Sequence, residues 1–201
     1  MKHGMLFVSV VVLLTMSCSG PRAVRSGDGT GNTSVDNQAL STKLDKVDLD
    51  YLADENTRAL FASGFWNKTV ERSPQPPRVA IWPIQNRTAQ HVDDQMDILL
   101  RRLETTLVNS GDVAVVARDR QESLLRELGI QQSYDFDPAT AGQLGAQLGV
   151  EYFLTGRITS VEEKTSSMRR VQYTLFIQVL NIETGQIGFQ NDASRTKALK
   201  R

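Results

Sequence analysis

The sequence contains one cysteine, two histidines and no excess of either charge. A single cysteine, Cys18, cannot form a disulfide within the chain, so a disulfide-stabilised fold is excluded. Only His91 lies beyond the first few residues, which excludes a metal site built from several histidines. The 23 basic residues balance the 23 acidic residues, so the chain has no basic field that would attract nucleic acid. We therefore expect neither a nucleic-acid partner nor a bound metal.

Catalytic sequence motifs are missing as well. No HExxH, GxSxG, Walker or zinc-spaced cysteine pattern occurs in the chain. The stretch "GDGTGN" is rich in glycine, but it has no preceding strand, no following helix and no Walker lysine, so it is not typical of a phosphate-binding loop. We expect no catalytic residues, no cofactor and no enzymatic activity.

The N-terminal apolar run is too short to cross a membrane. Met5 to Met16 is a stretch of twelve uncharged residues that follows Lys2 and His3. A spanning helix needs roughly 18 or more apolar residues, whereas a short run behind a positive charge is typical of a secretory signal peptide. We therefore expect residues 1–17 to be a signal peptide.

Small residues surround the cysteine at the end of this run, in the order Ser17-Cys18-Ser19-Gly20. The site resembles the bacterial lipobox, in which the cysteine is diacylated and becomes the first residue of the mature protein. Thr15 and Met16 stand at the outer positions, where the usual box has a leucine three residues before the cysteine. The alternative is an ordinary cleavable leader in which Cys18 is incidental. We expect lipidation at Cys18, since this also explains why the rest of the chain lacks cysteine.

A lipid anchor would fix the location of the protein. Two or more acyl chains hold a protein stably on a membrane surface without spanning it. In the sorting pattern that the lipobox resemblance implies, an aspartate after the cysteine retains the protein at the inner membrane. Ser19 stands at that position. We therefore expect a lipid-anchored protein on the periplasmic face of the outer membrane.

Composition divides the mature chain into three parts. Residues 18–47 are polar and rich in glycine, so they cannot bury enough apolar surface to become ordered, and we expect a flexible tether. Residues 48–77 are expected to form a helix, with Asp48 as its N-cap and Gly64 after its C-terminus, and then a proline-rich connector. Residues 78–201 suffice for one hydrophobic core, and we expect them to fold alone as a single α/β domain.

Hydrophobic periodicity within this domain predicts one mixed sheet with flanking helices. The expected order is β-α-β-α-α-β-β-β, over residues 78–84, 92–110, 113–117, 119–129, 138–149, 151–161, 170–183 and 186–190. The stretch "QNRTAQH" is predicted to be a turn. Helical crossovers predict that the first three strands run parallel, and short turns predict that the last strands form an antiparallel meander.

Three stretches of this domain resemble the LpoB family of outer-membrane lipoproteins, which activate a bifunctional penicillin-binding protein. They are "PIQNRTAQHVDDQMDILLRRLETTLVNSGDVAVVARD", "LGVEYFLTGRITSV" and "YTLFIQVLNIETGQIGF". Their short motifs are Asn86-Arg87-Thr88 with His91, the strand around Gly156, and Thr184-Gly185. The chain departs from the family in lacking a tryptophan near Phe189 and a long proline-rich tether. The resemblance implies that the domain docks on a peptidoglycan synthase and stimulates it.

The family motif supplies the candidate partner-binding residues Asn86, Arg87 and His91. Asn86 and Thr88 could instead shape the start of the following helix. Asp93, Asp94 and Asp97 beside His91 could suggest a divalent metal, but acidic residues in a first helical turn are explained by the helix dipole.

Arg169 and Arg170 are expected at a strand start or hairpin tip, as a solvated turn or a partner-facing patch. Trp66 and Trp82 are expected to be packing residues. We expect none of these four residues to be catalytic.

A second functional class remains open from the sequence. Curli-secretion and TolB-like periplasmic lipoproteins share the broad α/β pattern, and the chain could be a structural or secretion-associated protein of that type. A channel of that type needs a membrane-inserting amphipathic segment in every subunit, and no such alternating strands are evident outside the core. This favours the regulator of a cell-wall synthase.

Overall fold

The computed structural model describes residues 39–127 and 138–200, and residues 39–201 form one compact unit. The expected signal peptide, Cys18 and the first part of the expected tether lie outside the described residues. Side chains of a few residues within the helices, Asp93 and Leu125 among them, are also outside the description.

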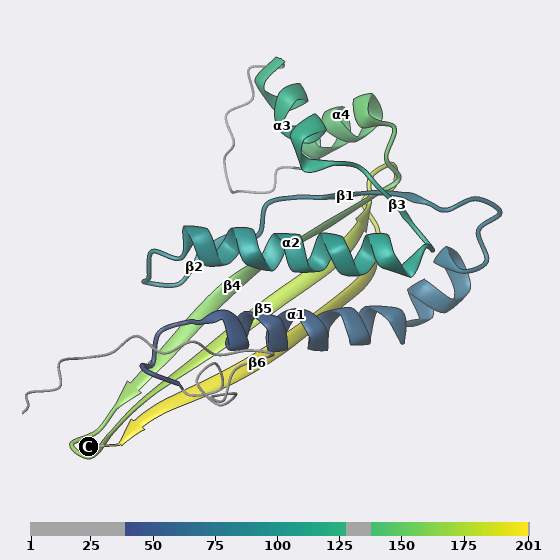
Figure 1. The fold of residues 1–201 in the computed structure, drawn as a ribbon. Coiled ribbons are helices and arrows are strands. Elements are labelled where there is room, and N and C mark those ends of the chain that lie inside the picture. The colour runs from purple at the N-terminus through teal and green to yellow at the C-terminus, as the bar shows by residue number, and fades with distance from the viewer. Residues whose placement is uncertain (1–38, 128–137, 201) are drawn as a thin grey trace, which may run out of the picture. The chain divides into compact units, whose positions relative to one another are not determined.

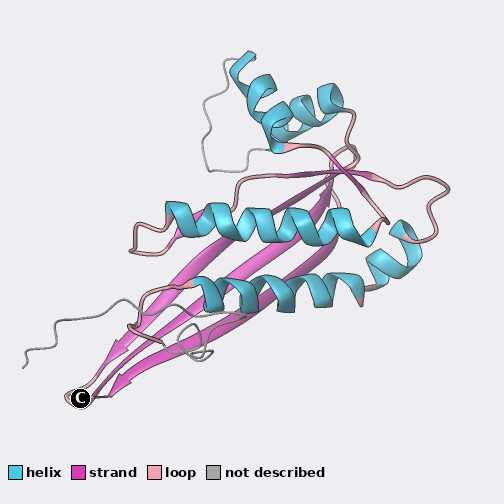
Figure 2. Cartoon of the chain, viewed as in Figure 1, coloured by secondary structure: helices cyan, strands magenta, loops and turns pink. Residues whose placement is uncertain are grey.

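Helices and strands alternate along the unit (Figure 1, Figure 2). The helices are α1 (Lys46–Phe61), the short π-helix η1 (Trp66–Val70), α2 (Asp93–Ser110), α3 (Arg118–Glu127) and α4 (Pro138–Leu148). The strands are β1 (Arg78–Ile81), β2 (Gln85–Arg87), β3 (Ala114–Val115), β4 (Tyr152–Lys164), β5 (Met168–Asn181) and β6 (Ile187–Lys200).

The strands form one mixed sheet in the order β3-β1-β4-β5-β6, with β2 paired to β4. Strand β1 runs parallel to both β3 and β4, whereas β4, β5 and β6 form an antiparallel meander. The predicted fold class and strand directions are therefore confirmed. The predicted turn at "QNRTAQH" differs in one respect, because its first three residues form β2 and extend the parallel part of the sheet.

Strand β6 is much longer than the sequence predicts. Its ladder with β5 continues from Phe189 to Lys200, where Lys200 pairs with Met168. The stretch "NDASRTKALK" has one β-branched residue, Thr196, and no aromatic residue, so it lacks the composition that identifies a strand from sequence. Strand propensity depends strongly on context, and here the neighbouring 14-residue strand β5 supplies the pairing partner for the whole length.

The two faces of the sheet are covered differently. Successive residues of a strand point to opposite faces. Val79 and Ile81 of β1 pack in the main core with α1 and α2, whereas Ala80 and Trp82 pack in a second cluster with α3 and α4. Figure 1 shows α1 and α2 side by side along the sheet, and α3 and α4 together beside β1 and β3. The predicted packing role of the tryptophans is consistent with Trp66 and Trp82 being buried.

Helix α1 belongs to the domain, and the expected boundary at residue 78 is therefore not where the fold begins. The side chains of Leu49, Leu52 and Leu60 are almost completely buried in the main core. The N-cap is Asp45 rather than Asp48. The two residues form a capping box, in which the Asp45 side chain accepts from the Asp48 N–H and the Asp48 side chain accepts from the Asp45 N–H. The helix ends at Phe61, before Gly64, and the chain continues into η1.

The last residues assigned to the tether are also part of the fold. Thr42 and Leu44 are buried. Tyr173 donates from its hydroxyl to the Thr42 carbonyl at 2.8 Å, and Lys197 Nζ donates to the Lys43 carbonyl at 2.8 Å. The ordered fold thus begins before residue 45, because two side chains of β5 and β6 fix the preceding backbone.

Candidate functional site

The motif Asn86-Arg87-Thr88 builds the turn between β2 and α2. Asn86 donates from Nδ2 to the Gln90 carbonyl at 2.9 Å, and its Oδ1 accepts from the N–H and the hydroxyl of Thr88 at 3.0 and 2.8 Å. Thr88 Oγ1 in turn accepts from the Gln90 N–H at 3.2 Å. Helix α2 has no side-chain cap at Val92. Asn86 and Thr88 therefore shape the turn before α2, and the Asn86 amide is largely used within it.

Gln90 connects this turn to the start of the fold. Its Oε1 accepts from the Leu44 N–H at 3.4 Å, and its Nε2 donates to the Tyr173 hydroxyl. Tyr173 also donates to Thr42, so the turn, strand β5 and the first ordered residues are held together. Burial raises the pKa of Tyr173 above its usual value, which keeps the hydroxyl protonated and able to donate.

The other two candidate residues, Arg87 and His91, lie in different places. Arg87 is exposed on β2, where it pairs in register with Thr159 of β4. Its Nε donates to Gln85 Oε1 at 3.3 Å, which places both side chains on one face of the strand. His91 is exposed just before α2. The structure thus brings Arg87 to the sheet and leaves His91 at the end of the turn, and their role in binding stays a prediction.

One face of the long strands has no helix over it in the described part of the chain. Helices α1 and α2 cover the opposite face, and α3 and α4 pack only on the end formed by β1 and the start of β4. We call the uncovered surface the open face. Strand alternation and register assign to it Thr155, Arg157, Thr159, Val161 and Glu163 of β4, Met168, Arg170, Gln172, Thr174, Phe176 and Gln178 of β5, and Gln190, Asp192, Ser194, Thr196, Ala198 and Lys200 of β6.

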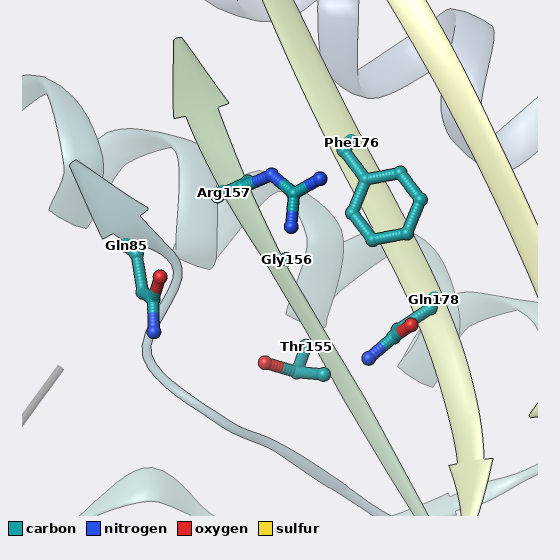
Figure 3. Close-up of a pocket in the computed structure, with 6 residues that line it drawn as sticks. All are labelled: Gln85, Thr155, Gly156, Arg157, Phe176 and Gln178. Carbon is teal, nitrogen blue, oxygen red and sulfur yellow. The ribbon is translucent and has the colours of Figure 1, made fainter. Parts of the chain in front are cut away.

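A shallow hollow lies on the open face between β2, β4 and β5 (Figure 3). Its lining consists of Gln85, Thr155, Gly156, Arg157, Phe176 and Gln178, and its volume is about 70 Å³. Pockets for small-molecule ligands usually measure roughly 300–1,000 Å³. The hollow is therefore too small for a cofactor or substrate, but it can receive one side chain of another protein.

Arg157 and Phe176 form the centre of the hollow. The guanidinium carbon lies 4.8 Å from the centroid of the Phe176 ring, in cation–π contact. The two residues are direct cross-strand partners, and Gln85 and Asp192 continue the same row on β2 and β6. No carboxylate forms an ion pair with Arg157 among the residues that the structure describes. Its guanidinium thus remains available to hydrogen-bond an added partner.

The other arginines of the β4–β5 hairpin are paired. Arg169 donates to both carboxylate oxygens of Glu162 at 2.7 and 2.8 Å, and Arg170 pairs with Glu163. The hydrogen bonds from Arg169 hold the pKa of Glu162 below its usual value. The solvated-hairpin interpretation of Arg169 and Arg170 therefore fits the structure. Arg157, which no motif in the sequence singles out, is the arginine of this hairpin that has no ion pair within the described residues.

Gly156 is required for the geometry beside the hollow. A Cβ atom added there would lie less than 3.0 Å from the Phe176 carbonyl oxygen, a distance that real Cβ contacts essentially never show. Strand β5 would have to move away from β4, and the Phe176 side chain with it. The glycine that carries part of the family resemblance is thus explained by the close approach of two backbones.

We expect Gly156→Ala to destabilise the domain by about 1–3 kcal/mol or more, because overpacking against backbone has no flexible neighbour to relieve it. Urea unfolding of full-length protein measures the effect. Gly142→Ala is the matched control, since a Cβ at Gly142 in α4 meets nothing within 4 Å. That change is expected to stabilise α4 by about 0.5–1 kcal/mol. Equal effects of the two substitutions would contradict the close-approach explanation.

No group of three metal-ligating side chains occurs among the side chains that the structure describes, which do not include Asp93. The Asp97 carboxylate accepts from Arg101 at 2.7 Å and from Arg118 at 2.9 Å. These hydrogen bonds hold the pKa of Asp97 below its usual value. Asp97 therefore joins α2 to α3.

Within the described part of the chain, no helix is long and apolar enough to span a membrane.

Comparisons with known proteins agree with this fold. The family model of the peptidoglycan-synthase activator LpoB matches residues 48–194. The C-terminal domain of LpoB from Escherichia coli is similar in structure, with a TM-score of 0.52 and 16% identity over 74% of this chain and 98% of that one. The NMR structure of E. coli LpoB has a TM-score of 0.51 and 13% identity, over 94% of this chain and 87% of that one.

The structural similarities show the fold alone, because the identities are low, and no curated protein matches the sequence. The family match shows more than the fold, because it covers most of the chain and begins inside α1. It includes the motif turn, the Gly156 strand and most of β6. The chain therefore belongs to the LpoB family of peptidoglycan-synthase activators.

Proposed function

We propose that this protein is an outer-membrane lipoprotein that binds a bifunctional penicillin-binding protein and raises its rate of peptidoglycan synthesis. The observation that carries the proposal is the family match over residues 48–194. Two features of the structure support a binding role. The open face offers a polar surface with Arg157, which has no ion pair within the described residues, and the hollow is too small to hold a substrate. The protein acts by docking, and the chemistry belongs to the synthase.

The start of the ordered fold limits the reach of the proposed anchor. About 21 residues separate Cys18 from Ala39, and a fully extended chain of that length spans at most roughly 70–75 Å. Melting α1 to lengthen this distance would remove part of the core, so α1 does not serve as extra tether. When the domain is docked, Ala39 must therefore lie within that distance of the outer membrane.

The direct test is glycan-strand synthesis from a lipid-linked precursor by the purified synthase, with and without this protein. We expect the protein alone to make no product and to raise the rate of the synthase severalfold. Albumin at the same concentration is the control for nonspecific stabilisation of the enzyme. An unchanged rate for every bifunctional synthase of the organism, together with no detectable binding, would remove the proposed function and leave the structural or secretion-associated alternative.

The proposed anchor makes a separate prediction. Cys18→Ala should abolish incorporation of a fatty-acid analogue and release the protein from the membrane fraction, because no other cysteine can accept the lipid. Metabolic labelling followed by fractionation of the envelope measures both. Ser19→Asp is the matched control, since it should keep the label and shift the protein to the inner membrane. Label retained in the Cys18→Ala protein would exclude lipidation at this position.

A further inference from the structure

We propose that the hollow on the open face receives a carboxylate side chain, aspartate or glutamate, from the peptidoglycan synthase, and that Arg157 is its anchor. This inference rests on the proposed function and adds the chemistry of the contact. The guanidinium presents several N–H donors in one plane, a geometry that matches the two oxygens of a carboxylate.

The surroundings of Arg157 favour an anionic acceptor. Contact with the Phe176 ring orients the guanidinium and leaves its donor edge free. Gln85, Thr155 and Gln178 line the same hollow from three strands, and their polar groups turn toward its interior (Figure 3). The Thr155 hydroxyl and the Gln178 amide can supply further hydrogen bonds to a carboxylate. We therefore expect the group that binds here to carry negative charge. The volume of the hollow limits it to a single short side chain.

The open face has the composition of a protein–protein interface. Apart from Arg157, the paired Arg170 and Glu163, Asp192 and, at the end of β6, Lys200, its described residues are mainly Thr, Ser and Gln. Binding surfaces are enriched in arginine and aromatic residues and depleted of lysine, and an arginine in a central pocket is a frequent energetic anchor. Val161, 63% exposed on the same face, adds apolar surface that a protein partner would cover.

A wall glycan is a poorer occupant of the same site. Sugars bind by stacking on open aromatic faces, but the Arg157 guanidinium already lies over the Phe176 ring. The stem peptides of peptidoglycan do carry carboxylates, so the experiment must distinguish a protein carboxylate from one of the wall. A protein partner is favoured, because the hollow lies in a broad sheet face rather than in a cleft that would enclose a polymer strand.

The test compares full-length variants for binding to the purified synthase. We expect Arg157→Gln to raise the dissociation constant at least about 30-fold, as when one partner of a desolvated charge pair is removed. Arg157→Lys should recover only part of the affinity, because an ammonium cannot form the bidentate pair. Arg170→Gln is the matched control on the same face, since Arg170 is already paired with Glu163, and it should change the affinity less than about threefold.

Two further measurements accompany the binding comparison. Thermal unfolding shows that each variant is folded, and isolated cell-wall sacculi are tested as a second binding target. Wild-type protein that binds the synthase while Arg157→Gln binds equally well overturns the anchor and leaves the proposed function intact. Arg157-dependent binding to sacculi but not to the synthase assigns the carboxylate to the wall and overturns the protein partner. Binding to neither target removes the proposed function and this inference with it.

Discussion

A fragment of residues 78–201 is expected to lack a cooperative unfolding transition, whereas a fragment of residues 39–201 unfolds as a single unit. The shorter fragment retains every strand of the sheet, and it is the domain that the sequence predicts. It lacks α1 and η1, which supply part of the main core on one face of the sheet.

The expected effect is large because the missing segment supplies much of the core. Its buried apolar side chains include Leu44, Leu49, Leu52, Leu60, Trp66 and Val70. Full burial of one such side chain contributes roughly 1.5–3 kcal/mol, and a whole domain is stable by only roughly 5–15 kcal/mol. Removing the segment also exposes the apolar face of β5 and β6, which makes the remaining chain prone to aggregate.

Urea unfolding followed by circular dichroism and tryptophan fluorescence compares the two fragments. Trp82 is common to both fragments and Trp66 occurs only in the longer one, so the fluorescence of the shorter fragment reports on the Trp82 cluster alone. The 39–201 fragment should show coincident transitions by both probes, and the 78–201 fragment a shallow and non-coincident one. A steep, coincident transition in the shorter fragment would show that α1 is an accessory to a core that is complete without it.

The role of α1 could not be predicted from sequence because a polar residue interrupts its apolar stripe. Asn56 lies on the buried face among leucines and leaves the apolar pattern of the sequence incomplete. In the structure its Nδ2 donates to the Leu52 carbonyl at 3.0 Å and to the Leu175 carbonyl at 3.1 Å, and its Oδ1 accepts from Asn191 at 3.0 Å. A buried amide is tolerated where such partners exist, and those on β5 and β6 are 119 and 135 residues away in the chain.

Elements with strong local signals could be predicted, as α2 and β5 show. Leucines at three- and four-residue spacing define α2, and Gly111 ends it with a positive φ of 76°. Strict alternation in "YTLFIQV" defines β5 and assigns its buried face correctly. Such patterns depend on one helix or one strand, so a single sequence contains them.

The hollow depends on register, which a single sequence does not contain. Only the register between β4 and β5 makes Arg157 and Phe176 direct neighbours, since a shift by one residue would bring another side chain opposite Arg157. The signal in the sequence was an arginine and a phenylalanine on the polar faces of two adjacent strands. The family motif points instead to Asn86, whose side-chain amide forms the turn before α2.

The second large effect is expected at Lys197, whose side chain is only 6% exposed. Lys197 Nζ donates to Asp45 at 2.5 Å, to Asp48 at 2.8 Å and to the Lys43 carbonyl at 2.8 Å. We expect Lys197→Met to destabilise the protein by about 3–5 kcal/mol, because it leaves the buried Asp48 carboxylate without its main partner. Lys46→Met is the matched control. Lys46 pairs with Asp50 on the surface, and its loss should cost less than about 1 kcal/mol.

The pH dependence of this difference separates lost charge pairing from lost packing. Burial favours a higher pKa for Asp45 and a lower one for Lys197, but the hydrogen bonds between them hold the pKa of Asp45 below its usual 3.8 and that of Lys197 above its usual 10.5. The stabilisation by Asp45 is complete above its usual pKa and is lost as the pH falls through its lower folded value. The stabilisation by Lys197 is complete below its usual pKa and is lost as the pH rises through its higher folded value.

The difference in unfolding free energy between wild type and Lys197→Met should therefore be constant from about pH 5 to pH 10 and shrink on both sides of that range. Urea unfolding of both proteins at about pH 3, 5, 7 and 10 measures it. A difference that stays the same at the lowest pH and at neutral pH would mean that methionine fails to fill the site, and that the ion pairs with Asp45 and Asp48 contribute little. A difference that shrinks at the lowest pH would mean that the start of the ordered fold is held chiefly by these charges.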